Sequence, residues 1–350
     1  MKKNIIFLII SIIISLGISE GLLRIFAKEI VPTSVPDRKL GTIYRKNLQY
    51  IHHDVESSMR PIPVSINSFG MRDKEWKLNN DSFKIMVLGD SFVEARQVAT
   101  EERFTELLQE KFLKNNLNVS VYNLGIGGRG PDGYLLFLKE FYQKIDPDVV
   151  IVALYNGNDF GEVNYKITPA SGRVNYIVSE GKIVAYNEVA SKIDGLIWNI
   201  KMPVGRLYLA QLANKVYLGF KYGRNTRDKG AAGYPLYCRI DSVDTGESFA
   251  IVEWLLREMK SIAGDNMIVM QIPAKEQLDM EKSDFCDNML PEKFIAKVAS
   301  RNNIKLLQLL PLMGENIKDY YWSHLNYAGH RFVAEALYEY LTPTVNPALP

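Results

Sequence analysis

The chain has 350 residues, of which 47% are hydrophobic and 23% are charged. These values are those of an ordinary globular protein, and they exclude a disordered, collagen-like or coiled-coil chain. The 42 Lys and Arg residues nearly balance the 40 Asp and Glu residues, so the formal net charge is only +2. A charge this small creates no overall field that would attract nucleic acid, and we expect no nucleic-acid partner.

An apolar segment follows the first residues of the chain. Residues 5–19 carry no charge, and the apolar pattern resumes beyond Glu20. The run fits a signal-peptide core and is slightly shorter than the roughly 20 residues of a spanning helix, so a cleaved signal and an uncleaved anchor both remain open. We favour a membrane anchor over residues 1–27. Lys2 and Lys3 would hold its start in the cytoplasm, so the rest of the chain would face the periplasm or the cell surface.

Two cysteines, Cys238 and Cys286, are too few and too far apart for a disulfide-rich scaffold or a four-ligand zinc site. In an oxidising compartment they could form one disulfide, which the sequence leaves open. No His-x-x-x-His or Cys-rich spacing accompanies the acidic residues, so we expect neither a metal ion nor a cofactor. The sequence does not indicate an oligomeric state.

The sequence divides into a lead-in segment and a domain with an insertion. Residues 28–82 are polar and contain several prolines, so we interpret them as a tether followed by a lead-in hairpin. Over residues 83–345, short β-branched runs alternate with helical stretches, and this pattern predicts an α/β domain built around a parallel sheet. The alternation fails over residues 161–246, which we interpret as an insertion.

Strands and helices alternate along the domain outside the insertion. In chain order, the sequence predicts strand 84–88, helix 100–113, strand 119–122, helix 133–144, strand 148–154, helix 247–263, strand 266–272, helix 291–300, strand 304–307 and helix 327–341. The third strand is apolar throughout after Asp148, as expected for a strand that is buried on both faces.

Ser91 follows the first strand of this domain, in the sequence Gly-Asp-Ser-Phe. A turn at the carboxyl edge of a parallel sheet presents a side chain and its own backbone N–H at the edge where open α/β folds bind ligands. The position therefore suits a nucleophile, although Gly-Asp-Ser is also ordinary turn composition.

A glycine-rich loop follows the second strand, with four glycines within residues 125–130. Glycine allows the backbone to approach a ligand and aim N–H groups at it, as a phosphate cradle or an oxyanion hole requires. A dinucleotide fingerprint would place its glycines after the first strand, so we do not expect a dinucleotide site. The Walker pattern is also missing, because no Gly-Lys-Ser or Gly-Lys-Thr follows.

Asn158 follows the third strand, where it could donate to a developing oxyanion or simply form a turn. His324 precedes the final helix and could take a proton from Ser91 as a general base. The chain has only four histidines, two of which lie in the lead-in segment. The fourth, His330, lies inside the final helix, where a packing or capping role is more typical than catalysis.

These blocks and their order resemble the SGNH (GDSL-type) hydrolase superfamily. The resemblance rests on Gly89-Asp90-Ser91, the glycine-rich loop, Gly157-Asn158-Asp159 and His324-Leu325-Asn326, and it covers residues 83–341 without the insertion. Residues 66–72 also look like the segment that precedes the first block in membrane-anchored bacterial members. The resemblance implies a three-layer αβα, flavodoxin-like fold with a mainly parallel sheet.

The resemblance also implies roles for individual residues. Ser91 would be the nucleophile, His324 the base, and the N–H groups of Ser91 and Gly128 together with the Asn158 amide would form the oxyanion hole. The family's acid stands two or three residues before the histidine, where this chain has Tyr and Trp. Asp319 is the nearest carboxylate, so we name it as the candidate third member. A backbone carbonyl that orients His324, and a loss of catalysis, are the alternatives.

The function that the resemblance implies is an extracytoplasmic serine esterase or acyl hydrolase acting on O-acyl groups of envelope polysaccharide. An O-acetyltransferase with the same site and a non-catalytic envelope protein that binds a glycan or another partner are the alternatives. The insertion contains several tyrosines and Trp198. These aromatic side chains could form a wall for stacking sugars, or a helical lid with its own small core.

Overall fold

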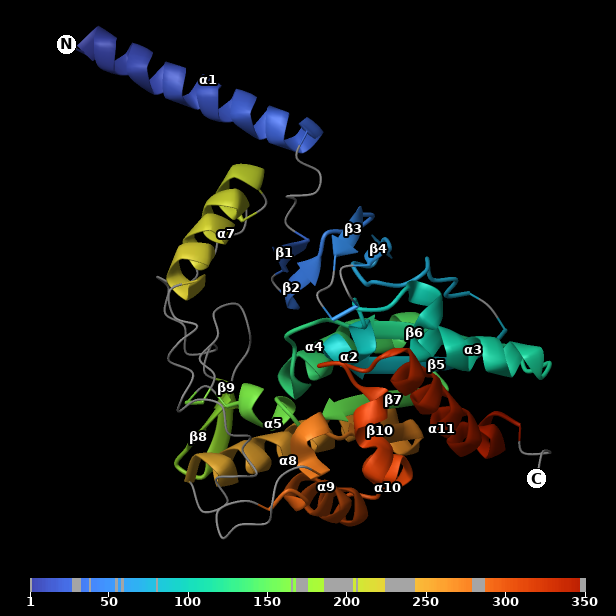
Figure 1. Cartoon of the computed structure of the whole chain (residues 1–350). Coiled ribbons are helices and arrows are strands. Elements are labelled where there is room, and N and C mark those ends of the chain that lie inside the picture. The colour runs from blue at the N-terminus through green and yellow to red at the C-terminus, as the bar shows by residue number, and fades with distance from the viewer. Residues whose placement is uncertain are drawn as a thin grey trace.

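Figure 1 shows the computed structural model of the chain, with an apolar helix, two small hairpins and an α/β domain. The structure describes residues 2–26, 33–37, 39–53, 56–57, 60–79, 81–164, 166–167, 176–185, 204–205, 207–223, 243–278 and 287–346. Cys238 and Cys286, whose pairing the sequence leaves open, lie outside these residues.

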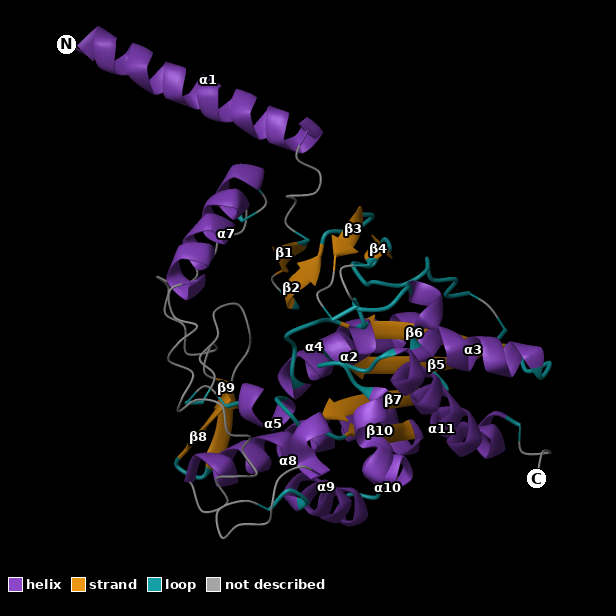
Figure 2. Ribbon diagram, in the orientation of Figure 1, coloured by secondary structure: helices purple, strands orange, loops and turns teal. Residues whose placement is uncertain are grey.

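A five-stranded parallel sheet forms the centre of the domain (Figure 2). From one edge to the other, its strands are β11 (Lys305–Gln308), β10 (Met267–Ile272), β7 (Val149–Tyr155), β5 (Phe83–Gly89) and β6 (Val119–Gly125). Every neighbouring pair is parallel. Counted along the chain, the spatial order is 2-1-3-4-5, which is the flavodoxin-like order. The predicted fold class is confirmed.

Helices cover both faces of this sheet, because successive side chains of a strand point to opposite faces. Met86 and Leu88 of β5 join one hydrophobic core, and Ile85 and Val87 join the other. The first core is covered by α4 (Pro131–Ile145), α8 (Val243–Ala263) and α9 (Leu290–Arg301), and the second by α3 (Phe104–Lys114) and α11 (Tyr327–Val345). The domain is therefore a three-layer αβα structure.

The helix expected over residues 100–113 is divided in two. Thr100–Glu102 form a short 3-10 helix, η2, and α3 begins only at Phe104. Between them Arg103 has an extended backbone, and its fully buried guanidinium pairs with Asp73 at 3.0 Å. This buried ion pair explains the interruption. The other predicted strands and helices of the domain are present with small shifts at their ends.

The lead-in segment forms two antiparallel hairpins where a tether and one hairpin were expected. The hairpins are β1 (Ser34–Asp37) with β2 (Gly41–Tyr44), and β3 (Gln49–His53) with β4 (Pro61–Ser65). Further along the segment, the Trp76 ring meets Tyr122 of β6 and Phe141 of α4 at centroid distances of 5.8 and 5.6 Å. Leu40 and Ile66 are buried in the same core as the sheet. Several side chains of the lead-in segment are therefore part of the domain core.

The helix α1 (Lys2–Phe26) contains the apolar N-terminal segment. Its residues Lys3–Phe26 are long and apolar enough to cross a membrane, a property that anchors and signal sequences share. Most of its large hydrophobic side chains are exposed.

The described part of the insertion contains three elements besides the short helix α5 (Asp159–Glu162). These are the hairpin strands β8 (Tyr176–Ser179) and β9 (Lys182–Ala185), and the helix α7 (Tyr208–Gly223). Tyr176 is buried, with its ring centroid 5.1 Å from that of Trp254 on α8. This tyrosine therefore belongs to the core, and Trp198 lies outside the described residues.

Candidate active site

Ser91 lies at the point where the strand order of the sheet reverses. It begins the short helix α2 (Ser91–Glu94) directly after β5, and Asp90 caps this helix by accepting a hydrogen bond from the Phe92 N–H at 2.8 Å. Asn158 follows the neighbouring strand β7. Open α/β sheets bind ligands at the carboxyl ends of the two strands that flank such a reversal. Ser91 and Asn158 are therefore at the edge where a ligand site is expected.

The structure brings His324 to Ser91. The distance from Ser91 Oγ to His324 Nε2 is 2.9 Å, although 233 residues separate them. His324 lies in a tight loop before α11, in which the Trp322 N–H donates to the His324 carbonyl at 2.8 Å. The ring of Phe92, the residue after Ser91, is 4.9 Å from the imidazole. The pair has the geometry of a hydroxyl and the base that activates it.

Glu56 holds the other side of the imidazole. Its Oε1 is 2.8 Å from His324 Nδ1, and its Oε2 accepts hydrogen bonds from the backbone N–H groups of His324 at 2.9 Å and Ser323 at 3.1 Å. Burial alone would raise the pKa of Glu56, but the hydrogen bonds from Ser323 and His324 hold it below its ordinary value. The ionised carboxylate favours a hydrogen on Nδ1, which leaves the Nε2 lone pair facing Ser91.

The expectation for Asp319 is corrected by this geometry, because the carboxylate on His324 comes from Glu56. Asp319 is exposed in the 3-10 helix η7 (Gly314–Tyr320), and its backbone carbonyl accepts a hydrogen bond from Asn326 Nδ2 at 2.8 Å. Tyr321, at one of the family's acid positions, is buried and donates its hydroxyl to the Pro273 carbonyl at 2.8 Å. Glu56 and His324 are 268 residues apart, so no short sequence motif contains both of them.

The glycine-rich loop lies against Ser91. A Cβ atom at Gly127 would be 3.6 Å from Ser91 Cβ, and the Gly127 N–H donates to Glu94 Oε2 at 2.6 Å. The next residue, Gly128, has a φ of +72°, and a Cβ there would meet nothing within 4 Å. The Gly127 N–H is therefore already bound to Glu94, and Gly128, which the resemblance assigns to the oxyanion hole, is the next residue of the loop.

Asn158 presents its amide at the end of β7. One of the two hydrogens on Nδ2 is used in a hydrogen bond to Glu162 Oε1 at 3.0 Å. An amide nitrogen carries a second hydrogen, and although burial raises the pKa of the neighbouring Asp90, a hydrogen bond from the Asn158 side chain acts to lower it. Asn158 is therefore oriented by carboxyl groups on both sides.

Arg72 of the lead-in segment holds the turn that follows Ser91. Its Nη1 donates to the Glu94 carbonyl at 2.8 Å, and its Nη2 donates to the Val98 carbonyl at 2.7 Å. Between them Ala95 has a φ of +54°, in the left-handed region that a residue with a Cβ rarely adopts. Burial, together with the nearby charge of Arg103, lowers the pKa of Arg72 to about 9. The lead-in segment thus supports the turn that follows Ser91, and it also supplies Glu56.

Two buried carboxyl groups lie beneath the site. Burial raises the pKa of Asp90 to about 7, and the charge of Glu162 adds to the effect. Burial, then the charge of Asp90, raises the pKa of Asp159 well above its ordinary value. Asp159 accepts hydrogen bonds from the Tyr134 hydroxyl at 3.0 Å and the Tyr155 N–H at 2.8 Å. Asp90 is the group next to Ser91 whose protonation changes near neutral pH.

His330 has the packing role that its place in the final helix suggested. It is fully buried, and its Nδ1 accepts a hydrogen bond from the Phe104 N–H at 3.3 Å. Burial lowers its pKa to about 3, and the charge of Arg103 contributes. The imidazole is therefore neutral and belongs to the core between α3 and α11.

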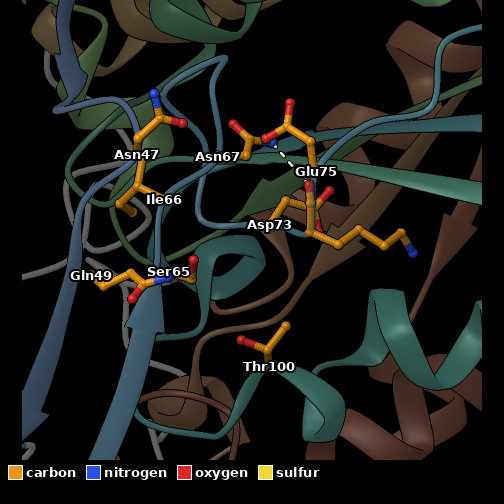
Figure 3. A pocket seen from close by; sticks show the side chains of 9 residues that line it. Asn47, Gln49, Ser65, Ile66, Asn67, Asp73, Glu75 and Thr100 are labelled. Carbon is orange, nitrogen blue, oxygen red and sulfur yellow. Dashed lines mark hydrogen bonds between the residues drawn. The ribbon is translucent and has the colours of Figure 1, made fainter.

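A separate pocket of about 300 Å³ lies over the lead-in segment (Figure 3). Its lining includes Gln49 of β3, Ser65 of β4 and Thr100 of η2, and none of its lining residues belongs to the Ser91, His324 and Glu56 group. In the part of the chain that the structure describes, no three His, Cys, Asp or Glu side chains are grouped so that they could hold a metal ion.

Comparison with known proteins identifies similar folds among solved structures, whereas no family model and no curated protein matches the sequence. The psychrotrophic esterase EstA from Pseudoalteromonas sp. is 14% identical, with a TM-score of 0.42 over 76% of this chain and 100% of that chain. A lipase/acylhydrolase from Enterococcus faecalis is 12% identical, with a TM-score of 0.44 over 76% of this chain and 99% of that chain.

A third similar structure is a member of the lipolytic protein G-D-S-L family from Veillonella parvula, at 15% identity and a TM-score of 0.39 over 74% of this chain and 98% of that chain. These solved structures are esterases and lipolytic proteins. Because the identities and TM-scores are low, the chemistry of this chain has to follow from its own strand order and side-chain geometry.

Proposed function

We propose that the protein is a carboxylic ester hydrolase of SGNH type in which Ser91 is the nucleophile, His324 the general base and Glu56 the orienting acid. The observation that carries this proposal is the continuous chain of two short contacts, 2.9 Å from Ser91 Oγ to His324 Nε2 and 2.8 Å from His324 Nδ1 to Glu56 Oε1. This is the arrangement of a serine, histidine and acid triad, which is recognised by geometry and not by chain order.

In the first half of the reaction, Ser91 Oγ attacks the ester carbonyl carbon while its proton passes to His324 Nε2. The negative charge that develops on the carbonyl oxygen is stabilised by the N–H groups of Ser91 and Gly128 and by the Asn158 amide. When the tetrahedral species collapses, the C–O bond of the ester breaks and His324 returns the proton to the leaving alcohol. An acyl group then remains on Ser91.

In the second half, water enters and His324 takes its proton as the oxygen attacks the acyl carbon. The bond to Ser91 Oγ breaks, the proton returns to Ser91, and the carboxylic acid leaves. If a sugar hydroxyl takes the place of water, the same steps transfer the acyl group to the sugar. The acyltransferase alternative therefore requires no residue beyond those of the hydrolase.

The non-catalytic alternative depends on the absence of an acidic residue two or three positions before His324 in the sequence. Glu56 occupies that place in space, and three hydrogen bonds hold it there, from one side-chain and two backbone nitrogens. The geometry therefore favours an activated serine over a site that only binds a glycan or another protein.

The test is fluorophosphonate labelling of the full chain in detergent, read by intact mass. We expect a single adduct that is lost in Ser91→Ala and strongly slowed in His324→Ala. Thermal unfolding of both variants provides the folding control. The absence of an adduct on folded wild-type protein would contradict the proposal and would favour the binding alternative.

We also propose that α1 anchors the protein and that Ser91 faces outward from the cytoplasm. The apolar composition of α1 and the two lysines at the start of the sequence support this orientation. A charged, membrane-impermeant fluorophosphonate applied to cells whose cytoplasmic membrane is exposed should label wild-type protein and not Ser91→Ala. Labelling that appears only after lysis would overturn the orientation and leave the esterase proposal intact.

For the substrate, we propose O-acyl groups on envelope polysaccharide, with O-acetyl transfer as the alternative. An outward-facing site beside the membrane supports this class of substrate. Release of acetate from an O-acetylated polysaccharide, lost in Ser91→Ala, is the expected result. Transfer of acetyl to an unmodified polysaccharide without release of acetate would instead identify a transferase.

A further inference from the structure

The insertion helix α7 is joined to the apolar helix α1 at one point. Both oxygens of Glu20 on α1 accept hydrogen bonds from the start of α7, from the Tyr208 N–H at 3.0 Å and from the Leu209 N–H at 3.1 Å. The guanidinium of Arg24, one turn further along α1, lies 5.1 Å from the centre of the Tyr208 ring. Glu20 thus supplies the acceptors that the first N–H groups of a helix lack within the helix itself.

The same tyrosine joins α7 to the α/β domain. Its hydroxyl accepts a hydrogen bond from Arg45 Nη1 at 2.6 Å, and the Arg45 guanidinium lies 4.7 Å from the ring centre. Arg45 directly follows β2, whose last residue, Tyr44, is buried in the domain core. Tyr208 therefore contacts an arginine of α1 and an arginine of the domain.

Beyond this junction α7 exposes an apolar face. Ala213, Val216 and Tyr217 are exposed at i, i+3 and i+4, so they share one side of the helix. The side chains of Val216 and Tyr217 are 49% and 58% exposed. Val204 and Leu207, just before the helix, are also exposed.

Elsewhere in the described chain, exposed large hydrophobic side chains outside α1 are isolated ones, at Ile51, Leu113, Val243 and Leu312. The sequence of α7 contains two lysines and no acidic residue. An apolar face on a helix that carries only positive charge is typical of a helix that lies on a membrane surface.

The depth of the junction agrees with such a position. At a rise of about 1.5 Å per residue, about 20 residues cross the roughly 30 Å hydrocarbon core of a bilayer, so a helix that enters at Lys3 leaves the core near Arg24. Glu20 is one turn before Arg24, at the outer boundary of the core. Figure 1 shows α7 running across the direction of α1, with the α/β domain beyond the C-terminal end of α1.

We propose that α7 lies on the outward-facing surface of the membrane beside α1, with Ala213, Val216 and Tyr217 in contact with lipid, and that the Tyr208 junction sets the orientation of the domain on the bilayer. This inference rests on the proposal that α1 is an uncleaved anchor. It also gives α1 a role that a cleaved signal could not have, because cleavage after Ser19 would remove the apolar residues before Glu20 and leave Glu20 at a new N-terminus with no membrane-spanning helix.

The test places an environment-sensitive fluorophore on single cysteines of the full chain in which Cys238 and Cys286 are replaced by serine. The protein is reconstituted in vesicles of phosphatidylethanolamine and phosphatidylglycerol, with or without lipids that carry a quencher. Val216→Cys reports on α7, Leu16→Cys reports on the anchor, and Leu113→Cys is the matched control because it is an equally exposed hydrophobic position on α3.

We expect strong quenching at positions 16 and 216 and none above background at position 113. If position 16 is quenched but position 216 is quenched no more than position 113, the proposal for α7 is overturned and the anchor is retained. An unquenched position 16 would overturn the anchor itself, and with it the inference about α7.

The Tyr208 junction is tested by Glu20→Ala in the same labelled chains. We expect quenching at position 216 to fall severalfold while quenching at position 16 stays unchanged, because α7 loses its acceptors and the anchor keeps its apolar residues. Equal quenching at position 216 with and without Glu20 would overturn the role of the junction.

Discussion

Glu56 Oε1 lies 2.8 Å from His324 Nδ1, across a separation of 268 residues. Glu56 belongs to the lead-in segment, which precedes every strand of the sheet in the sequence. His324 lies just before the last helix of the domain. The same segment supplies Arg72, which binds the carbonyls of the turn after Ser91. Both contacts depend on the packing of this segment into the core, so the proposed catalytic geometry and the lead-in fold are coupled.

The substitution Glu56→Gln should reduce kcat on a small activated ester by about 10²–10⁴-fold with little change in KM, because an amide can hold His324 in the wrong tautomer. Steady-state kinetics of the detergent-solubilised full chain measure this effect. Asp319→Asn is the matched control and should retain activity close to wild type. A large loss in Asp319→Asn with normal rates in Glu56→Gln would reverse the assignment.

The substitution Asn158→Ala should lower kcat by about 10²–10³-fold, which is the usual cost of losing one oxyanion-hole donor. The control is Glu162→Gln, since a glutamine oxygen can still accept the hydrogen bond from Asn158 Nδ2. It should stay within a few-fold of wild type. If the two variants lose activity equally, Asn158 acts through the structure of the turn and not on the oxyanion.

The substitution Gly125→Ala should destabilise the domain by about 1–3 kcal/mol or more, as overpacking of a filled interior does. A Cβ at this position would lie 2.2 Å from the Glu94 backbone nitrogen, and backbone cannot move aside as a side chain can. Gly246→Ala on α8 is the control, because a Cβ there meets nothing within 4 Å. Urea unfolding should show the control to be neutral or slightly stabilised, and equal midpoints for the two variants would contradict the close approach of β6 and α2.

The stability of the protein should fall as the pH rises from about 4 to about 7, in part because of Asp90. Its pKa is about 7 in the folded chain and near 3.8 ordinarily, so in this window the folded state holds a proton that the unfolded state releases. Asp90→Asn keeps an oxygen that can cap α2 and removes the titration. Its melting temperature should depend less on pH than that of the wild type.

Asp159, whose pKa is also raised, remains in this variant, so the pH dependence should be reduced and not abolished. Thermal unfolding at several pH values measures the slope, and Asp319→Asn should leave the slope as it is in the wild type. An unchanged slope in Asp90→Asn would mean that Asp90 is ionised in the folded protein throughout this range.

Much of the fold could be predicted from the sequence because its signals are local. Buried strands such as β7 are continuous apolar runs, and the alternation of strands with helices requires a parallel sheet. The helix over residues 100–113 was less well predicted. The predicted helix is interrupted at Arg103, whose buried side chain pairs with Asp73. Helical periodicity in the sequence cannot reveal a partner 30 residues away.

In the candidate site too, some residues could be predicted from the sequence and one could not. Ser91, Gly128 and Asn158 follow consecutive strands of the domain, so the edge of the sheet that they share could be predicted from their places in the chain. His324 is at 2.9 Å from Ser91, as the proposed pairing requires. Asp319 was the nearest carboxylate along the chain, but nearness along the chain does not determine nearness to an imidazole in the folded protein.

By itself, the sequence determined the apolar N-terminal helix, the parallel α/β architecture and the strand ends at which Ser91 and Asn158 lie, because each depends on residues that are close together in the chain. Only the tertiary structure decided that Glu56 and not Asp319 meets His324, that Arg72 holds the nucleophile turn, and that Glu20 joins α1 to α7. These contacts join segments whose approach depends on how the lead-in segment and the insertion pack, and no local pattern of residue types encodes that packing.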